Sequence, residues 1–172
     1  FLQPWFDLND TTVLVTGGSG FVGRNLVELM RARGLTPVVP TRKDYDLLEP
    51  IHIRKMLADI KPDLVIHLAG LVGGIGANRE RPADFNYQNL MMGTSMLHES
   101  WKAGVKKYVT LMGGCSYPSD AKSPIGEDQM WRGFPQKESA GYSTAKMMQL
   151  VQAFAYRRQH GLAAAPHAPA VL

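Results

Sequence analysis

The chain has 172 residues, 45% of them hydrophobic, and its 19 lysines and arginines against 15 acidic residues give a formal charge of +4. This length supports one good hydrophobic core, so a single domain is expected. The cations form no long basic block and no apolar stretch approaches the roughly 20 residues of a membrane span, so neither nucleic acid nor a membrane is expected as a partner.

The N-terminal half predicts a strand over residues 12–16, a glycine-rich turn over 16–23, and a helix that Gly34 ends. The apolar residues between 21 and 30 recur with helical period. A second short strand is expected at 37–40. A helix is expected at 50–60, because Pro50 suits a first turn and the apolar residues that follow share one face.

The C-terminal half predicts a buried strand at 63–69, a long helix at 82–103, a strand at 107–112, an irregular segment at 113–138, and a helix at 139–160 that Gly161 ends. The tail at 162–172 is rich in Ala and Pro and reads poorly as a strand, although its position requires one. Strands that alternate with helices predict an α/β fold: a Rossmann-like, doubly wound parallel sheet with helices on both faces.

The chain begins without Met and stops where this sheet would be completed. We therefore expect residues 1–172 to form one Rossmann-like domain of a longer protein that continues beyond residue 172.

The turn Thr-Gly-Gly-Ser-Gly-Phe-Val-Gly at 16–23 is the first chemical motif. Gly17 permits the sharp bend, Gly20 lets the backbone approach a pyrophosphate, and Gly23 lets the helix pack against the strand. The helix that begins at Phe21 and Val22 offers free N–H groups and a positive dipole end to the phosphates. The alternative is an ordinary glycine-rich connection.

The end of the second strand selects between the two nicotinamide cofactors. Arg42 and Lys43 stand where an acidic residue is usual in NAD enzymes, and cations suit a 2′-phosphate, so NADP is favoured over NAD. Asp44 and Asp46 keep NAD open, because either could reach a ribose hydroxyl. Arg42 and Lys43 could also be a solvated surface pair.

Tyr142 and Lys146 are four residues apart on the last helix, so they share one face. An ammonium about 5 Å from a phenol, at an effective dielectric of about 20, would lower its pKa by about two units. The pair therefore predicts acid-base catalysis by Tyr142. A plain helix surface with an extended lysine is the alternative.

Several segments together resemble the extended short-chain dehydrogenase/reductases, and within them the GDP-L-fucose synthases. The segments are Val-Gly-Gly-Ile-Gly-Ala-Asn at 72–78, Pro-Ala-Asp-Phe at 82–85, Tyr-Gln-Asn at 87–89, Cys-Ser-Tyr-Pro at 115–118, Pro-Ile-Gly-Glu at 124–127 and the Tyr142 motif. The resemblance implies an NADP-dependent epimerase/reductase acting on a GDP-4-keto-6-deoxy-hexose. The alternatives are another NAD(P)-dependent nucleotide-sugar epimerase or dehydratase, or a catalytically impaired cofactor-binding subunit.

The resemblance also implies residue roles. Cys115 would transfer protons during epimerisation, Tyr142 would protonate the C4 oxygen, and Lys146 would hold the ribose. The resemblance implies that residues 1–172 form the NAD(P)-binding Rossmann domain and that a substrate domain follows. The proton-transfer histidine is expected beyond residue 172. Further cofactor contacts are expected at Asp46, Leu47, Ala69, Leu71, Asn89, Leu111 and Pro169. Cys115 could instead be a small buried hydrophobe, and Asn89 could simply pack.

Gly113 is the largest departure from the family pattern, which has a serine or threonine here to hydrogen-bond the keto oxygen. Losing one such donor typically costs about 10²–10³ in rate. Placing serine at 113 is therefore expected to raise reduction if no other group supplies the donor.

The remaining expectations concern compartment, metal and assembly. Cys115 is the one cysteine, which excludes an internal disulfide and fits a cytoplasmic protein. No metal site is expected, and His67 is expected to be a satisfied core histidine. In the resembling family two long helices of each subunit form the dimer interface, which implies a homodimer.

Overall fold

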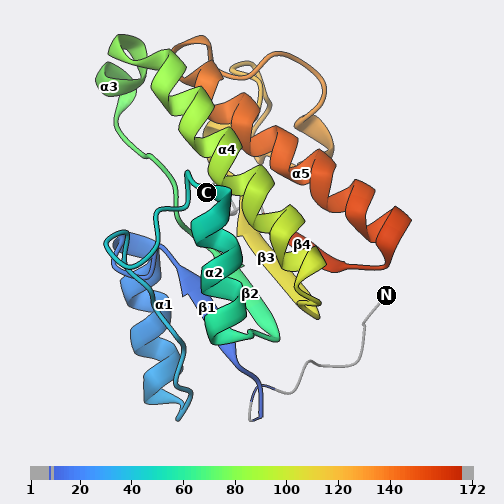
Figure 1. Ribbon diagram of the computed structural model, residues 1–172. Helices are drawn as coiled ribbons and strands as arrows, with labels where there is room; N and C mark the ends of the chain where they lie inside the picture. The colour runs from blue at the N-terminus through green and yellow to red at the C-terminus, as the bar shows by residue number, and fades with distance from the viewer. Residues whose placement is uncertain (1–7, 9, 168–172) are drawn as a thin grey trace.

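The structure is a computed structural model that describes residue 8 and residues 10–167. One parallel sheet contains the strands β1 (Val13–Thr16), β2 (Leu64–His67), β3 (Lys107–Leu111) and β4 (Ala163–His167), in that spatial order (Figure 1). Val13 pairs with Leu64, Leu64 with Lys107, and Lys107 with Ala163. The predicted parallel α/β sheet is confirmed.

The predicted strand at 37–40 is reduced to a single bridge between Leu14 and Val38. Val38 accepts a hydrogen bond from the Val15 N–H and donates one to the Val13 carbonyl. Pro37 and Pro40 have no N–H, which prevents the ladder from extending. Val38 thus lies beside one edge of β1, whereas β2 pairs with its other edge. A topological switch point therefore lies at β1.

The described residues contain five α-helices: α1 (Phe21–Ala32), α2 (Pro50–Ile60), α3 (Ile75–Glu80), α4 (Pro82–Lys102) and α5 (Ala140–His160). The four long ones lie within one or two residues of the predicted bounds. The short α3 was not predicted. The segment predicted as irregular contains three single-turn 3₁₀ helices, at Gly114–Ser116, Glu127–Gln129 and Lys137–Ser139.

Alternate strand residues face two different hydrophobic clusters. Leu14, Val65 and Tyr108 pack with α2, α4 and α5 on one face, whereas Val13 and Val15 pack with α1 on the other. This is the period-2 alternation that a strand imposes. Figure 1 shows α1 set apart from the group of α2, α4 and α5, so the predicted helices on both faces are confirmed.

The long helices α4 and α5 run side by side, and glycines let them approach closely. A Cβ at Gly141 of α5 would lie 2.6 Å from the Pro82 carbonyl oxygen, and the Asn86 side chain donates a hydrogen bond to the Gly141 oxygen.

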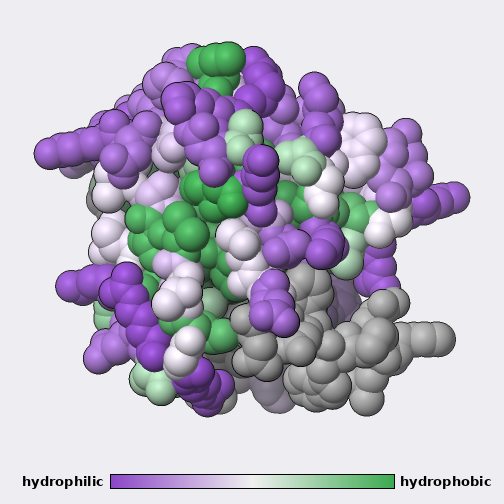
Figure 2. All heavy atoms as spheres, turned by 60° about the horizontal axis from the view of Figure 1, so that its bottom comes forward, coloured by the Kyte–Doolittle hydropathy of each residue, from purple (hydrophilic) through white to green (hydrophobic). Residues whose placement is uncertain are grey.

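The Ala-rich tail does form a strand, β4, as its position required. Its Ala164 is buried against α5 and β3. Seen from its lower edge, the molecule carries projecting hydrophilic side chains around a more apolar centre (Figure 2). Across the described residues, no helix combines the length and apolar character needed to cross a bilayer.

Candidate active site

A cavity of about 550 Å³ lies at the carboxyl ends of β1, β2 and β3, beside the switch point. Open α/β sheets bind ligands in this position. Most of the residues predicted to bind a cofactor or to catalyse line it: Gly17, Gly20, Phe21, Val22, Gly23, Arg42, Asp46, Leu47, Ala69, Leu71, Leu111, Tyr142 and Lys146.

The glycine turn is fixed by backbone contacts. Gly17 has φ +70°, and a Cβ there would lie 2.5 Å from the Ala69 nitrogen. A Cβ at Gly23 would lie 2.2 Å from the Gly17 oxygen, so α1 could not pack against the turn. Gly18, given no role from the sequence, leaves room for Val39, because its Cβ would lie 2.4 Å from a Val39 methyl.

The N-terminus of α1 opens on this cavity. Gly20 is its N-cap and supplies no side chain to satisfy the first N–H groups. These groups and the positive end of the helix dipole are suited to an anion.

Arg42 and Asp46 lie together at the rim. The guanidinium of Arg42 is 3.3 Å from the Asp46 carboxylate, and its side chain is 74% exposed. The Leu48 N–H donates to Asp46, which together with the nearby Arg42 holds the pKa of that carboxyl below its ordinary value. Asp44 is not in the cavity wall, and instead accepts hydrogen bonds from the backbone and side chain of Thr41.

Tyr142 and Lys146 both face the cavity from α5. Lys146 is buried, which lowers the pKa of its ammonium to about 8, and its Nζ has no hydrogen-bond partner among the described residues. Burial, with a smaller electrostatic contribution from the neighbouring Cys115, raises the pKa of Tyr142. The predicted lowering of the Tyr142 pKa by Lys146 is therefore wrong, because the desolvation of the phenol dominates.

Gly113 and Cys115 lie beside Tyr142 but do not line the cavity themselves. A Cβ at Gly113 would lie 2.9 Å from Cε1 of Tyr142 and 3.3 Å from the Cys115 sulfur. The Ser143 hydroxyl donates a 3.0 Å hydrogen bond to the Cys115 carbonyl, which fixes the turn beside the helix. Ser116 is fully buried in that turn. The structure thus brings Tyr142, Cys115 and position 113 together.

Asn89 lies behind the cavity. It accepts a hydrogen bond from the Leu71 N–H at 3.0 Å and donates to the Leu71 oxygen at 2.9 Å. It therefore fixes the backbone of a cavity residue. Pro169, also predicted to contact the cofactor, lies outside the described residues.

His67 is fully buried, and its Nδ1 lies 2.8 Å from the Thr16 hydroxyl. Its Nε2 has no partner among the described residues, so the predicted satisfied histidine is only half satisfied. Burial, with a smaller contribution from the charge of Lys146, lowers the pKa of His67 to about 3. The ring is neutral at physiological pH.

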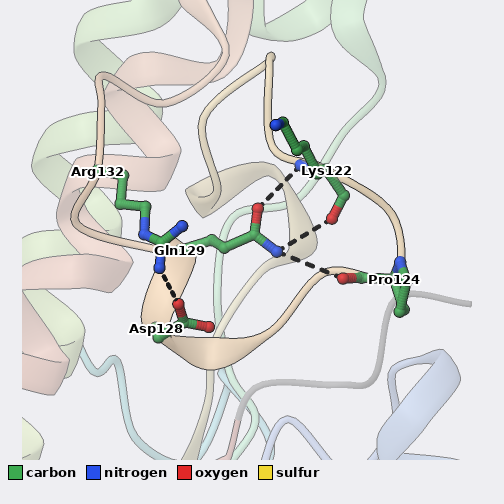
Figure 3. Close-up of polar contacts among 5 residues, drawn as sticks. All are labelled: Lys122, Pro124, Asp128, Gln129 and Arg132. Atoms are coloured by element: carbon green, nitrogen blue, oxygen red, sulfur yellow. Dashed lines mark hydrogen bonds and ion pairs between the residues drawn. The ribbon is translucent and has the colours of Figure 1, made fainter.

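One side-chain amide links parts of the segment between β3 and α5. Gln129 accepts a hydrogen bond from the Lys122 N–H and donates to the carbonyls of Lys122 and Pro124, while Arg132 pairs with Asp128 (Figure 3). Next to it Met130 is buried with Tyr117 and Met147. This segment packs against the start of α5, which carries Tyr142.

Several cavity residues were not identified from the sequence. They include Gln88 and Met92, four residues apart on α4, and Ser19, Tyr45 and Val72. The helical spacing of Gln88 and Met92 around Asn89 is a signal that could have indicated them.

A second cavity, of about 560 Å³, lies near the amino ends of β2 and β3, and Lys61, Asp63, Glu99 and Lys102 are among the residues that line it. It contains none of the predicted site residues. Among the described residues, no group of three or more His, Cys, Asp or Glu side chains is placed to hold a metal ion.

Comparison with known proteins gives a consistent result. Residues 13–169 match the model of the NAD dependent epimerase/dehydratase family. A GDP-L-colitose synthase of Yersinia pseudotuberculosis is 36% identical over 135 residues, which are 78% of this chain and 44% of that protein. A GDP-L-fucose synthase of Sinorhizobium fredii is 34% identical over 159 residues, which are 92% and 51% of the two chains.

Solved structures agree. A GDP-mannoheptose C4 reductase from Campylobacter jejuni with NADP bound superposes with a TM-score of 0.89 at 30% identity, covering 95% of this chain and 52% of that one. A GDP-L-fucose synthetase from Naegleria fowleri bound to NADP gives 0.83 at 26% identity, with 96% and 55% covered. The chain spans about half the length of the curated relatives that it matches.

Proposed function

Because the chain belongs to the NAD dependent epimerase/dehydratase family, we propose that it is the dinucleotide-binding part of an NADP-dependent epimerase/reductase that acts on a GDP-4-keto-6-deoxy-hexose. The observation that supports this most is the cavity at the switch point, which joins the glycine turn, Arg42 and the Tyr142–Lys146 pair. Relatives named for GDP-sugar chemistry support the substrate class.

The residues of the cavity fit such a nucleotide. Lys146 presents a desolvated ammonium without a partner among the described residues, and the uncapped start of α1 suits a diphosphate. Arg42, mostly exposed at the rim, suits a 2′-phosphate. In this proposal residues 1–172 form one NAD(P)-binding Rossmann domain.

NADPH, when bound, supplies the hydride for reduction at C4. Lys146, whose ammonium is buried in the cavity, would hold the ribose hydroxyls. Tyr142 donates the proton to the C4 oxygen, and Cys115, beside the Tyr142 ring, exchanges protons at the carbons next to the keto group.

The proposal includes assembly and compartment. Met148, Val151 and Phe154 expose apolar surface along α5, as Tyr87 does on α4, and a homodimer through these helices would bury it. Cys115, which has no second cysteine in the sequence, is consistent with a cytoplasmic enzyme.

Nucleotide titration tests the cofactor assignment. We expect the protein to quench or shift NADPH fluorescence at micromolar concentration and to bind NADPH more tightly than NADH. Arg42→Ala should remove this preference while NADH binding persists. Equal affinity of the unmodified protein for both nucleotides would contradict the role of Arg42, and no binding of either would contradict the proposal.

Substitution of the tyrosine tests the chemistry. Tyr142→Phe should abolish C4 reduction of the GDP-4-keto sugar and leave NADPH affinity nearly unchanged, because only the acidic hydroxyl is lost. Full turnover by this variant would end the assignment. A protein that binds NADPH but reduces no such sugar would instead support a non-catalytic, cofactor-binding subunit, which the glycine at position 113 favours.

A further inference from the structure

Gln149 is a buried polar side chain that the proposed mechanism does not use. It is 2% exposed and lies three residues after Lys146 on α5, on a neighbouring part of the helix surface. Both ends of its amide have partners. Nε2 donates to the backbone carbonyl of Asn89 at 3.0 Å, and Oε1 accepts from the Thr110 hydroxyl at 3.3 Å. The side chain therefore joins α5 to α4 and to β3.

Gly93 creates the space for this amide. A Cβ at position 93 of α4 would lie 2.1 Å from both Cδ and Nε2 of Gln149, a distance at which no side chain could remain. Gly93 and Gln149 thus fit together as a pair at the centre of the α4–α5 contact.

The partner of Gln149 is itself tied to the cavity. Asn89 holds both backbone polar groups of Leu71, which lines the cavity. A Cβ at the adjacent Gly70 would lie 2.8 Å from Oδ1 of Asn89 and 3.8 Å from Nζ of Lys146, so amide and ammonium converge on one stretch of backbone. On the other side, Thr110 precedes Leu111, another cavity residue.

We propose that Gln149 is a positioning residue for the nucleotide site. It acts through Asn89 on Leu71 and through Thr110 on Leu111, and so holds the segments after β2 and at the end of β3 in place beside Lys146. The inference rests on the proposed function, because it concerns nucleotide binding in that cavity.

Replacement of the amide by an apolar chain of similar length tests this role. In Gln149→Met we expect the dissociation constant for NADPH to rise about fivefold, the equivalent of one lost buried hydrogen bond. The measurement is made well below the melting temperature, where a residue that only stabilises the fold would leave the affinity of the folded protein unchanged.

Gln152 offers a matched control. Its Nε2 donates to the Thr94 backbone carbonyl at 3.0 Å, so it also links α5 to α4, but through Thr94 and not through Asn89. Gln152→Met should leave NADPH affinity unchanged. Equal weakening by the two substitutions, or no weakening by Gln149→Met, would overturn the proposal.

A second variant decides the matter if Gln149→Met does not fold. Thr110→Val keeps the shape of the side chain and removes the donor to Oε1 of Gln149, so NADPH should bind more weakly. Unchanged affinity in that variant would also overturn the proposal. A failure of the proposed function is seen separately, as an unmodified protein that binds no NADPH.

Discussion

The space around Gly113 is occupied by the Tyr142 ring. Because a Cβ there would lie 2.9 Å from Cε1 of the ring, position 113 cannot gain a side-chain hydroxyl without moving the phenol. Serine at position 113 would therefore have two opposing effects on the rate of C4 reduction. Its hydroxyl would add a hydrogen-bond donor for the keto oxygen, and its Cβ would displace the Tyr142 phenol.

A comparison of two substitutions separates these effects. Gly113→Ala adds only the Cβ, so we expect it to lower kcat/KM for C4 reduction by displacing Tyr142. Gly113→Ser adds the same atom and a donor, and should exceed Gly113→Ala by about 10²–10³ if the keto oxygen lacks a partner. NADPH affinity serves as the control. Equal rates for the two variants would show that another group already supplies the donor.

His67 makes stability depend on pH. Its pKa is lowered from 6.5 to about 3 in the folded protein, so as pH falls below 6.5 the unfolded chain takes up a proton that the folded chain does not. The free energy of unfolding should fall by up to about 1.4 kcal/mol per pH unit from this residue between about pH 6 and 4. Urea unfolding at several pH values measures it. His67→Asn should show a flatter pH profile, and an identical profile would contradict the assignment.

Most of the residues that line the cavity could be predicted from the sequence, because glycines with required backbone contacts and a Tyr–Lys pair form recognisable sequence patterns. The energetics of these residues could not be predicted. The pKa of Tyr142 depends on how much solvent the fold removes, and the Gly93–Gln149 fit joins residues from two helices that no local pattern connects.

At the scale of elements, the contact between α4 and α5 positions Tyr142. Tyr142 follows Gly141, which approaches the Pro82 carbonyl at the first turn of α4, and Asn86 bonds to the Gly141 oxygen. The starts of the two helices are thus held together, and Tyr142 with them.

Gly141→Ala should disturb this contact. The added Cβ would lie 2.6 Å from the Pro82 oxygen, so we expect the free energy of unfolding to fall by about 1–3 kcal/mol. Gly76→Ala is the control, because nothing lies within 4 Å of a Cβ at that helical position. Chemical denaturation compares the two. An equal effect of both substitutions would show that the α4–α5 approach tolerates a methyl group.

The elements with a long hydrophobic period were predicted from the sequence nearly to the residue, as α2 shows. The elements that the sequence predicted poorly have local causes. Pro37 and Pro40 shorten the expected second strand to one bridge. The six-residue α3 is too short to show a period, and β4 is fixed by its pairing with β3 rather than by its own composition.

At the scale of the whole molecule, apolar side chains exposed on α5 predict association. If Phe154, which is 54% exposed, lies in a dimer interface, Phe154→Glu should convert dimer to monomer in sedimentation velocity and leave NADPH binding intact. Phe134→Glu, at a 68% exposed position in the segment before α5, should leave the mass unchanged. A monomeric unmodified protein would contradict the homodimer.

The strand order β1-β2-β3-β4 has a consequence for synthesis on the ribosome. β2, β3 and β4 each pair with the strand that is synthesised just before it, so the sheet can grow strand by strand as the polypeptide emerges. Lys146, however, is translated only after β3. A nascent chain would therefore contain the glycine turn well before it acquires Lys146, which lines the same cavity.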